Sequence, residues 1–171
     1  KSIAGSLQWI TRNCRPDLAY RVSKVQSASN AGGTVRDIRM ANKVVDYALA
    51  TSGQGLTFKS GVIDWGNLVL GVITDASFAN ESSLVKNPSE IIDEDDDVNV
   101  ELHRSQGSKL MTLMTTNILT NQETGFHLIG YSSNLIRRVC RATVQAEAYT
   151  LQQGVEGGDR LRAAIVDTMG K

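Results

Sequence analysis

Residues 67–74, "NLVLGVIT", form the apolar run that decides the fold, and Asp75 follows this run directly. Valine, leucine and isoleucine in a run of this length predict a buried strand. An acid immediately after such a strand has two explanations. Aspartate commonly begins a turn, and a strand can also carry a carboxylate to a metal site. The stretch by itself favours the turn, because a short motif match is no more than a hypothesis.

Two further stretches have strand character. Residues 108–116 read "SKLMTLMTT" and residues 125–133 read "GFHLIGYSS", and loops separate them from each other and from the first run. Three strands in succession along the chain predict an antiparallel meander.

Helices are predicted before the meander. Residues 2–11, 16–29 and 35–51 carry apolar side chains at helical spacing. Pro16 suits the first turn of the second helix, where a missing backbone N–H costs nothing. Thr34 can cap the third helix with its hydroxyl group.

A long helix is predicted after the meander, over residues 142–168. The expected buried stripe consists of Val144, Ala148, Leu151, Val155, Leu161 and Ile165. Glycines within this segment weaken it, and close packing on a sheet would explain them. The alternative is a break at 157–158 followed by a strand, "AAIVD", at 163–167. Together the elements indicate an α/β protein of the α+β kind, with an N-terminal helical segment, a three-strand meander and a packed C-terminal helix.

Composition bounds the class of protein. The 171 residues correspond to roughly one domain, and the formal net charge of +0 predicts no general attraction to nucleic acid. Cys14 and Cys140 lie far apart without metal-ligand spacing, which is typical of reduced thiols in an intracellular protein, cytoplasmic or nuclear. No membrane span or signal peptide is visible. The absence of an initiator methionine suggests a segment of a longer protein.

Residues 81–104 are polar and contain an acidic run at 93–97, "DEDDD". Like charges repel, so this segment is predicted to be a solvated loop. A carboxylate-rich metal site is the minor alternative, because the run lacks the glycine and the closing glutamate of a calcium loop.

Two acids are candidates for chemistry. Asp75 follows the first strand, and Glu147 lies near the start of the C-terminal helix. A helix packed across a meander can bring the two together, and paired carboxylates hold magnesium. Taken alone, Glu147 reads as an ordinary exposed glutamate.

A basic segment precedes Glu147. Its candidate nucleic-acid-binding residues are Ser132, Ser133, Arg137, Arg138 and Arg141. Arginine and hydroxyl side chains are the groups that contact phosphate backbones. A solvated loop is an equally good explanation of the same residues.

Several of these stretches resemble one family in the same order. The matching motifs are "RPDLAYRVSKVQS" at 15–27, the helix of 35–51, "GLTF" at 55–58, "TDASFAN" at 74–80, "SQGSKLMTL" at 105–113 and "IGYSSNLIRRVCRATVQAEAYTLQQG" at 129–154. The chain resembles the part of copia-type retrotransposon Pol polyproteins that follows the polymerase. The resemblance makes residues 1–60 a connection segment and residues 61–171 a ribonuclease H domain, truncated at its C-terminus.

This resemblance implies a ribonuclease H-like mixed sheet flanked by helices. It implies hydrolysis of the RNA strand of RNA–DNA hybrids with two Mg²⁺ ions and an in-line water. Asp75 and Glu147 become the expected catalytic residues and metal ligands. The expected partners are the hybrid and the rest of the polyprotein, with the polymerase upstream and the remaining ribonuclease H strands downstream.

The sequence departs from the family pattern in three places. Many relatives carry an acid and then a tryptophan where this chain has Ser77 and Phe78. The acidic 81–104 segment is longer than usual. The third carboxylate of the family lies on a strand after the last helix; Asp159 is a poor substitute for it, and Asp167 becomes one only if "AAIVD" is a strand. We therefore expect residues 1–171 alone to be inactive.

Two other interpretations stay open at this point. The same fold can serve as a non-catalytic binding or structural module beside the polymerase. The chain can also be a generic α/β domain whose resemblance misleads.

Overall fold

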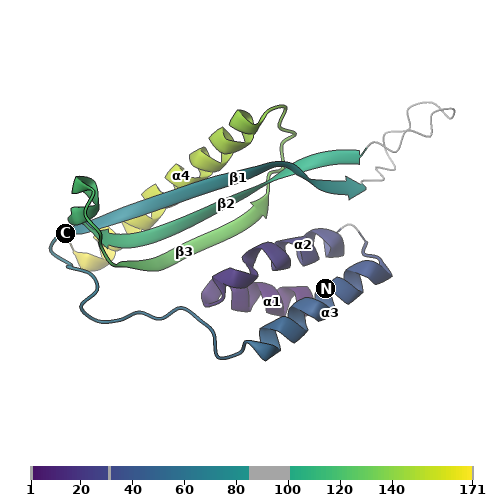
Figure 1. Ribbon diagram of the computed structural model, residues 1–171, viewed down its shortest axis with the longest axis horizontal. Helices are drawn as coiled ribbons and strands as arrows, with labels where there is room; N and C mark the ends of the chain where they lie inside the picture. Colours follow the sequence, from purple (N-terminus) through teal and green to yellow (C-terminus); the bar gives the residue numbers. More distant parts are fainter. Residues whose placement is uncertain (1, 31, 85–100, 171) are drawn as a thin grey trace.

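The computed structural model describes residues 2–30, 32–84 and 101–170. Within them, a helical segment precedes an antiparallel sheet and a long C-terminal helix (Figure 1). The elements are α1 (Ser2–Asn13), η1 (Pro16–Leu18), α2 (Ala19–Asn30), α3 (Val35–Ala50), β1 (Leu68–Leu84), β2 (Glu101–Thr115), η2 (Thr116–Thr120), β3 (Phe126–Leu135) and α4 (Thr143–Met169). The sheet has the order β1-β2-β3. The predicted α+β class and the three-stranded antiparallel meander are confirmed.

The N-terminal helices share a small core of their own. Its buried side chains are Ala4, Leu7, Leu18, Val22, Val25 and Val44. Thr34 begins α3 with a capping box: the Thr34 hydroxyl accepts the Asp37 N–H, and the Asp37 carboxylate accepts the Thr34 N–H at 2.8 Å. Ile38 and Leu49, two of the apolar residues at helical spacing in α3, are 62% and 68% exposed. Only a narrow stripe of α3 around Val44 is therefore covered by the other helices.

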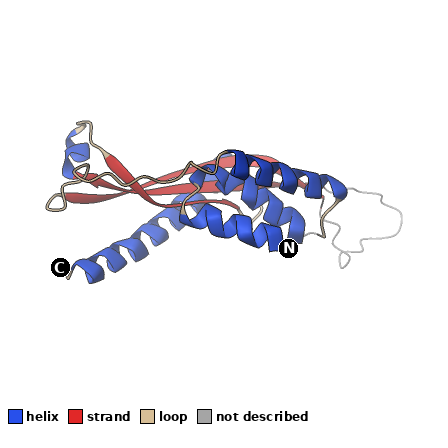
Figure 2. Ribbon diagram, turned by 90° about the horizontal axis from the view of Figure 1, so that it is seen from below, coloured by secondary structure: helices blue, strands red, loops and turns tan. Residues whose placement is uncertain are grey.

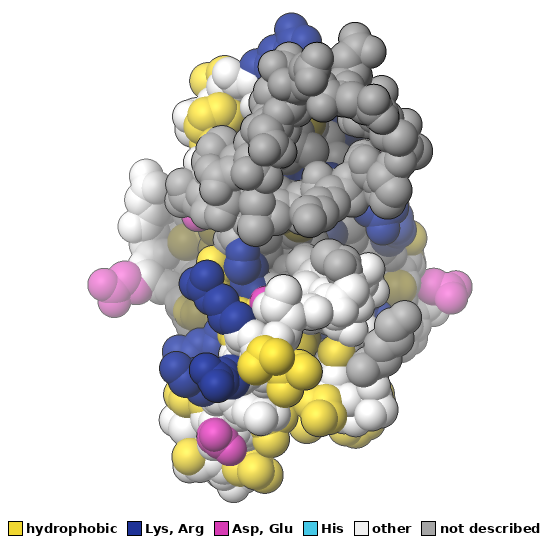
Figure 3. All heavy atoms as spheres, turned by 90° about the vertical axis from the view of Figure 1, so that its right-hand side faces the viewer, with side chains coloured by type: hydrophobic (Ala, Val, Ile, Leu, Met, Phe, Trp, Pro, Cys, Tyr) yellow, Lys and Arg dark blue, Asp and Glu magenta, His cyan; other side chains and the backbone are white. Residues whose placement is uncertain are grey.

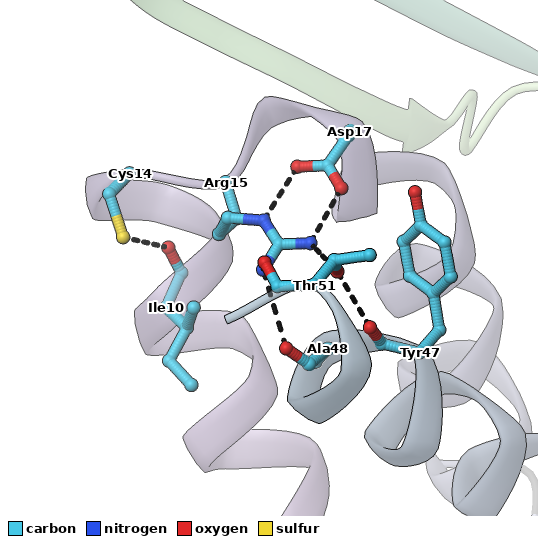
Figure 4. A network of polar contacts seen from close by, with 7 residues as sticks. All are labelled: Ile10, Cys14, Arg15, Asp17, Tyr47, Ala48 and Thr51. Atoms are coloured by element: carbon cyan, nitrogen blue, oxygen red, sulfur yellow. Dashed lines mark hydrogen bonds and ion pairs between the residues drawn. The ribbon is translucent and has the colours of Figure 1, made fainter. Parts of the chain in front are cut away.

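A buried arginine joins the start of α2 to the end of α3 (Figure 4). Arg15 is 3% exposed, and its guanidinium holds the Asp17 carboxylate through two bonds of 2.9 and 2.8 Å. The same group donates to the Thr51 carbonyl at 3.0 Å and to the Thr51 hydroxyl at 2.6 Å. Carbonyls at a helix C-terminus lack partners within the helix, so Arg15 satisfies one of them while its own charge is paired.

The first strand does not end at Asp75, contrary to the sequence prediction. β1 continues beyond it, and the register against β2 shifts between Ser77 and Glu81. Ala79 takes a left-handed backbone conformation, with φ of 51°, and its N–H donates to the Ser105 hydroxyl at 3.2 Å. A bulge inserts an extra residue without ending a strand. The small residues after Asp75 therefore form a bulge, where the sequence predicted a turn.

The predicted loop at 81–104 is correspondingly too long at both ends. Residues 81–84 belong to β1, and residues 101–104 belong to β2. The acidic run at 93–97 lies outside the described residues.

Small side chains form the face of α4 that packs on β1 and β2. The buried residues of α4 are Ala146, Thr150, Gly154 and Gly158. A Cβ atom added to Gly154 would lie 2.4 Å from the Thr74 Cγ2 atom, and one added to Gly158 would lie 2.8 Å from the Val72 Cγ2 atom. Glycine is therefore required at both positions by the close approach of the helix to the sheet.

The first four residues of the apolar stripe predicted to pack on the sheet are exposed, and only Leu161 and Ile165 are half-buried. Val144, Leu151 and Val155 are 78%, 55% and 54% exposed. α4 is also continuous through 157–158, so the alternative strand at 163–167 is wrong. The C-terminal half of α4 projects away from the N-terminal helices (Figure 2).

Polar contacts attach the N-terminal helices to the other face of the sheet. The Tyr131 hydroxyl on β3 donates to the Thr11 carbonyl on α1. The Gln106 amide on β2 donates to the Ser23 hydroxyl on α2 at 3.3 Å. The sheet thus lies between α4 on one side and the N-terminal helices on the other (Figure 1). The predicted division at residue 60 stays a prediction.

Replacing Arg15 should destabilise the fold strongly. Arg15→Ala is expected to lower the free energy of unfolding by about 3 kcal/mol, the low end for a broken buried ion pair, because Asp17 keeps partial solvent access. Arg15→Lys should recover only part of this loss, since an ammonium group cannot form the two parallel bonds. Urea unfolding followed by circular dichroism measures both, with the exposed Arg12→Ala as control. Equal stability of the Arg12 and Arg15 variants would contradict this assignment.

The Arg15–Asp17 pair should also make the stability of the fold depend on pH. The hydrogen bonds from Arg15 hold the pKa of Asp17 below its ordinary value of 3.8. A lowered pKa in the folded state contributes stability above the unfolded pKa, and this contribution is lost as pH falls through the folded pKa. Asp17→Asn should therefore be less stable than wild type at neutral pH, and the difference should shrink below about pH 4. Thermal unfolding across pH 2–7 tests this, with Asp46→Asn as control; a difference independent of pH would contradict it.

Candidate functional site

Glu147 reaches the edge strand of the sheet. Its Oε1 atom accepts the backbone N–H of Ala76 at 3.3 Å, across 71 positions of sequence. The completely buried Ala146 sets the start of α4 directly on the sheet, so the next residue along the helix lies within reach of β1. An edge strand leaves half of its backbone donors without a strand partner, and Glu147 satisfies one of them.

Asp75 precedes Ala76 but presents its side chain to the other face. Residues 74 and 76 contact α4 and the small core around Ala146, and side chains alternate between faces along a strand. Asp75 is exposed and lines a pocket of about 410 Å³ together with Asp17 and Tyr20 of the N-terminal segment. The two predicted acids therefore meet at the same point of β1: Asp75 lines the pocket beside the N-terminal helices, and the Glu147 carboxylate reaches the edge of the strand from α4.

The resemblance implies two magnesium ions beside Asp75 and Glu147. Carboxylate oxygens are the ligands that magnesium prefers, so the chemistry of the pair fits. Two ions about 3.5–4 Å apart need more carboxylate ligands than this pair supplies. Within the described ranges, no group of three or more histidine, cysteine, aspartate or glutamate side chains could hold a metal ion. A two-metal site would therefore need further ligands beside Asp75 and Glu147.

The predicted nucleic-acid-binding residues separate into two places. Ser132 and Ser133 line the pocket that contains Asp75, and the Ser133 hydroxyl accepts the Gln106 amide at 2.9 Å. Arg137 and Arg138 line a second and larger groove of about 640 Å³. The sequence had treated the serines and arginines as one surface, and the turn after β3 divides them.

The arginines follow the end of β3, and Lys and Arg side chains lie at several separate places on the face of the molecule drawn in Figure 3. Arg137, Arg138 and Arg141 are all exposed. The Arg138 guanidinium lies over the Tyr149 ring, 5.4 Å from its centroid. Its hydrogen bond to the phenol oxygen, at 3.5 Å, lowers the pKa of Tyr149.

Sequence reasoning missed the walls of the second groove. One wall is a polar stripe on α2, and the other is a polar stripe on α4. The residues are Ser23, Gln26, Ser27 and Asn30 on α2, and Tyr149, Gln152, Gln153 and Glu156 on α4. Both sets follow the spacing i, i+3, i+4, i+7 that places residues on one helix face. That repeated polar pattern is the sequence feature that could have predicted the two walls of the groove. The apolar spacing of the same helices does not indicate them.

Comparison of the chain with protein-family models, curated proteins and solved structures gives no match. Functional inference therefore rests on the residues and geometry of the chain itself. No helix in the described part of the chain is both long and apolar enough to cross a membrane.

The contact from Glu147 to β1 should contribute to stability. Glu147→Ala removes the acceptor of the Ala76 N–H and is expected to cost about 1 kcal/mol. Glu147→Gln keeps an oxygen acceptor and should cost less. Chemical denaturation measures both, and Glu156→Ala, an exposed glutamate on the same helix, is the control. A Glu147→Ala variant as stable as the control would show that the contact contributes nothing.

Proposed function

We propose that the chain is part of a retrotransposon-type reverse transcriptase and ribonuclease H polyprotein, and that residues 61–171 form its ribonuclease H-like module. In this proposal the module engages RNA–DNA hybrid, and Asp75 and Glu147 are acids of a magnesium-dependent hydrolysis in the parent polyprotein. The proposal is supported by the resemblance of the motifs and by the order of the elements, three antiparallel strands followed by an acid-bearing helix.

The single observation that carries the proposal is the contact from Glu147 to the strand that bears Asp75. A helix glutamate that packs anywhere else on the sheet would leave the two acids unrelated. Here the Glu147 carboxylate lies at the amide of the residue directly after Asp75, as the resemblance implies for the two acids of such a domain.

The exposed arginines supply the proposed contact to the hybrid. Arg137 and Arg141 lie in the turn between β3 and α4, on the same end of the molecule as the start of α4. Arginine contacts to phosphates are largely independent of sequence and weaken as salt increases. This surface therefore suits a hybrid that is recognised through its backbone.

A second candidate function is a non-catalytic hybrid-binding or structural module. One observation favours it: the Glu147 carboxylate already accepts the backbone N–H of Ala76 on the edge strand, and Asp75 lines the pocket beside the N-terminal helices. In that case both acids serve the structure of the edge strand, and magnesium has no role in binding.

Hybrid binding tests the proposed function directly. Fluorescence anisotropy with a labelled RNA–DNA hybrid, measured across salt concentrations, should detect binding by residues 1–171. Arg137→Ala and Arg141→Ala should each weaken binding and reduce the salt slope by about one unit per lost phosphate contact. Arg162→Ala, which removes the same charge from the exposed far part of α4, is the control. No binding, or equal effects of all three variants, would overturn the proposal.

Magnesium separates the two candidate functions. If Asp75 and Glu147 bind a magnesium ion that also contacts the hybrid, magnesium should strengthen hybrid binding in wild type. It should not do so in Asp75→Asn or Glu147→Gln. If the acids are structural, magnesium should change binding equally in all three proteins. Cleavage by residues 1–171 is not expected, because two carboxylates supply too few ligands for two ions. Cleavage that disappears in Asp75→Asn would show that this expectation is wrong.

A further inference from the structure

The groove between α2 and α4 has walls built from matching polar stripes. Each helix contributes four residues at the spacing i, i+3, i+4, i+7, and the end of β3 with the following turn, residues 134–138, forms the floor. Three of the eight wall residues are glutamines and one is an asparagine. Amide side chains both donate and accept hydrogen bonds, so the groove can bind a ligand whose edges offer both kinds of group.

The charge of the groove favours an anionic ligand. Arg137 and Arg138 lie on its floor and are exposed. Its one acidic wall residue, Glu156, already has partners on the same helix: Gln152 donates to it at 3.1 Å, and Arg160 lies 3.6 Å away. The positive charge of the floor is therefore not cancelled within the groove.

A planar cation also lies in the groove. The Arg138 guanidinium lies 5.4 Å from the centroid of the Tyr149 ring and donates to its hydroxyl at 3.5 Å, so a planar cation and an aromatic ring lie side by side in the groove. Unpaired nucleic-acid bases stack on aromatic rings and on arginine planes. Bases within a duplex are already stacked on one another and cannot use such a platform.

We infer that this groove binds single-stranded nucleic acid, with phosphates on the arginines, a base on Arg138 and base edges against the amide side chains. The groove volume of about 640 Å³ lies within the range of small-ligand sites, roughly 300–1,000 Å³, and thus admits a short unpaired stretch. The inference rests on the proposed nucleic-acid function and adds to it a ligand class and a role for the N-terminal segment. Through α2, residues 1–60 supply one of the two walls of the groove.

Charge placed on each wall tests the groove. Ser27→Glu on α2 and Gln153→Glu on α4 change exposed lining residues. Each should weaken binding of a labelled single strand of polythymidine roughly tenfold at low salt, through repulsion of the phosphates. Asn42→Glu, the same charge on an exposed position of α3 outside the groove, should leave binding nearly unchanged. Circular dichroism confirms that each variant is folded.

The stacking platform has its own variant. Arg138→Lys keeps the positive charge but removes the plane, so it should weaken single-strand binding roughly fivefold and leave the salt slope unchanged. Unchanged affinity and unchanged slope in Arg138→Lys would assign Arg138 to phosphate contact, which a lysine can also make, and would overturn the stacking role.

A blunt RNA–DNA hybrid, measured in parallel, separates this inference from the proposed function. Single-strand binding unaffected by both wall variants overturns the inference, and hybrid binding that persists in that case leaves the proposed function standing. Wall variants that weaken only hybrid binding also overturn the inference, since the groove would then hold the duplex. Failure of wild type to bind either probe overturns both.

Discussion

The Arg15 guanidinium is the contact on which the arrangement of the N-terminal segment depends. At this guanidinium, the loop after α1, the first turn leading to α2 and the end of α3 meet in a single charged group (Figure 4). A buried cation needs a charged partner and hydrogen-bond acceptors for its N–H groups. Without them the free-energy cost of removing it from water is not compensated. Asp17 and Thr51 supply them only when α2 and α3 lie in the observed orientation, so the pair selects that orientation.

The orientation of α2 then decides which side chains lie beside the sheet. Ser23 reaches Gln106 on the sheet, and Thr11 on α1 accepts the Tyr131 hydroxyl on β3. These contacts hold the α2 polar stripe beside the end of β3, opposite the stripe on α4. On the other side of the sheet, the close approach of α4 brings Glu147 to β1. Both candidate sites thus depend on helices held at fixed distances from the sheet.

The sequence predicted the elements and their order but not the faces of those elements. Hydrophobic period and turn residues located the helices and strands, because these are local properties. Asp75 was placed at a strand end because small polar residues usually indicate a turn; the Ser105 hydroxyl, which supports the left-handed Ala79, lies on another strand. The face of α4 was assigned wrongly because burial was expected to follow hydrophobicity. The approach to Thr74 and Val72 decided it instead, and no local pattern reports that distance.

The glycine-lined face of α4 has a consequence for how such a sequence can drift. On most helices the apolar positions are constrained and the small ones are free to vary. Here a methyl group added at Gly154 or Gly158 meets the sheet, while Val144 and Leu151 face outward and can be exchanged for many other side chains. Among descendants of this chain that keep the packing, these outward-facing aliphatic positions of α4 would diverge first, and the glycines against the sheet would diverge last. The usual relation between hydropathy and evolutionary constraint is then inverted along this part of the helix.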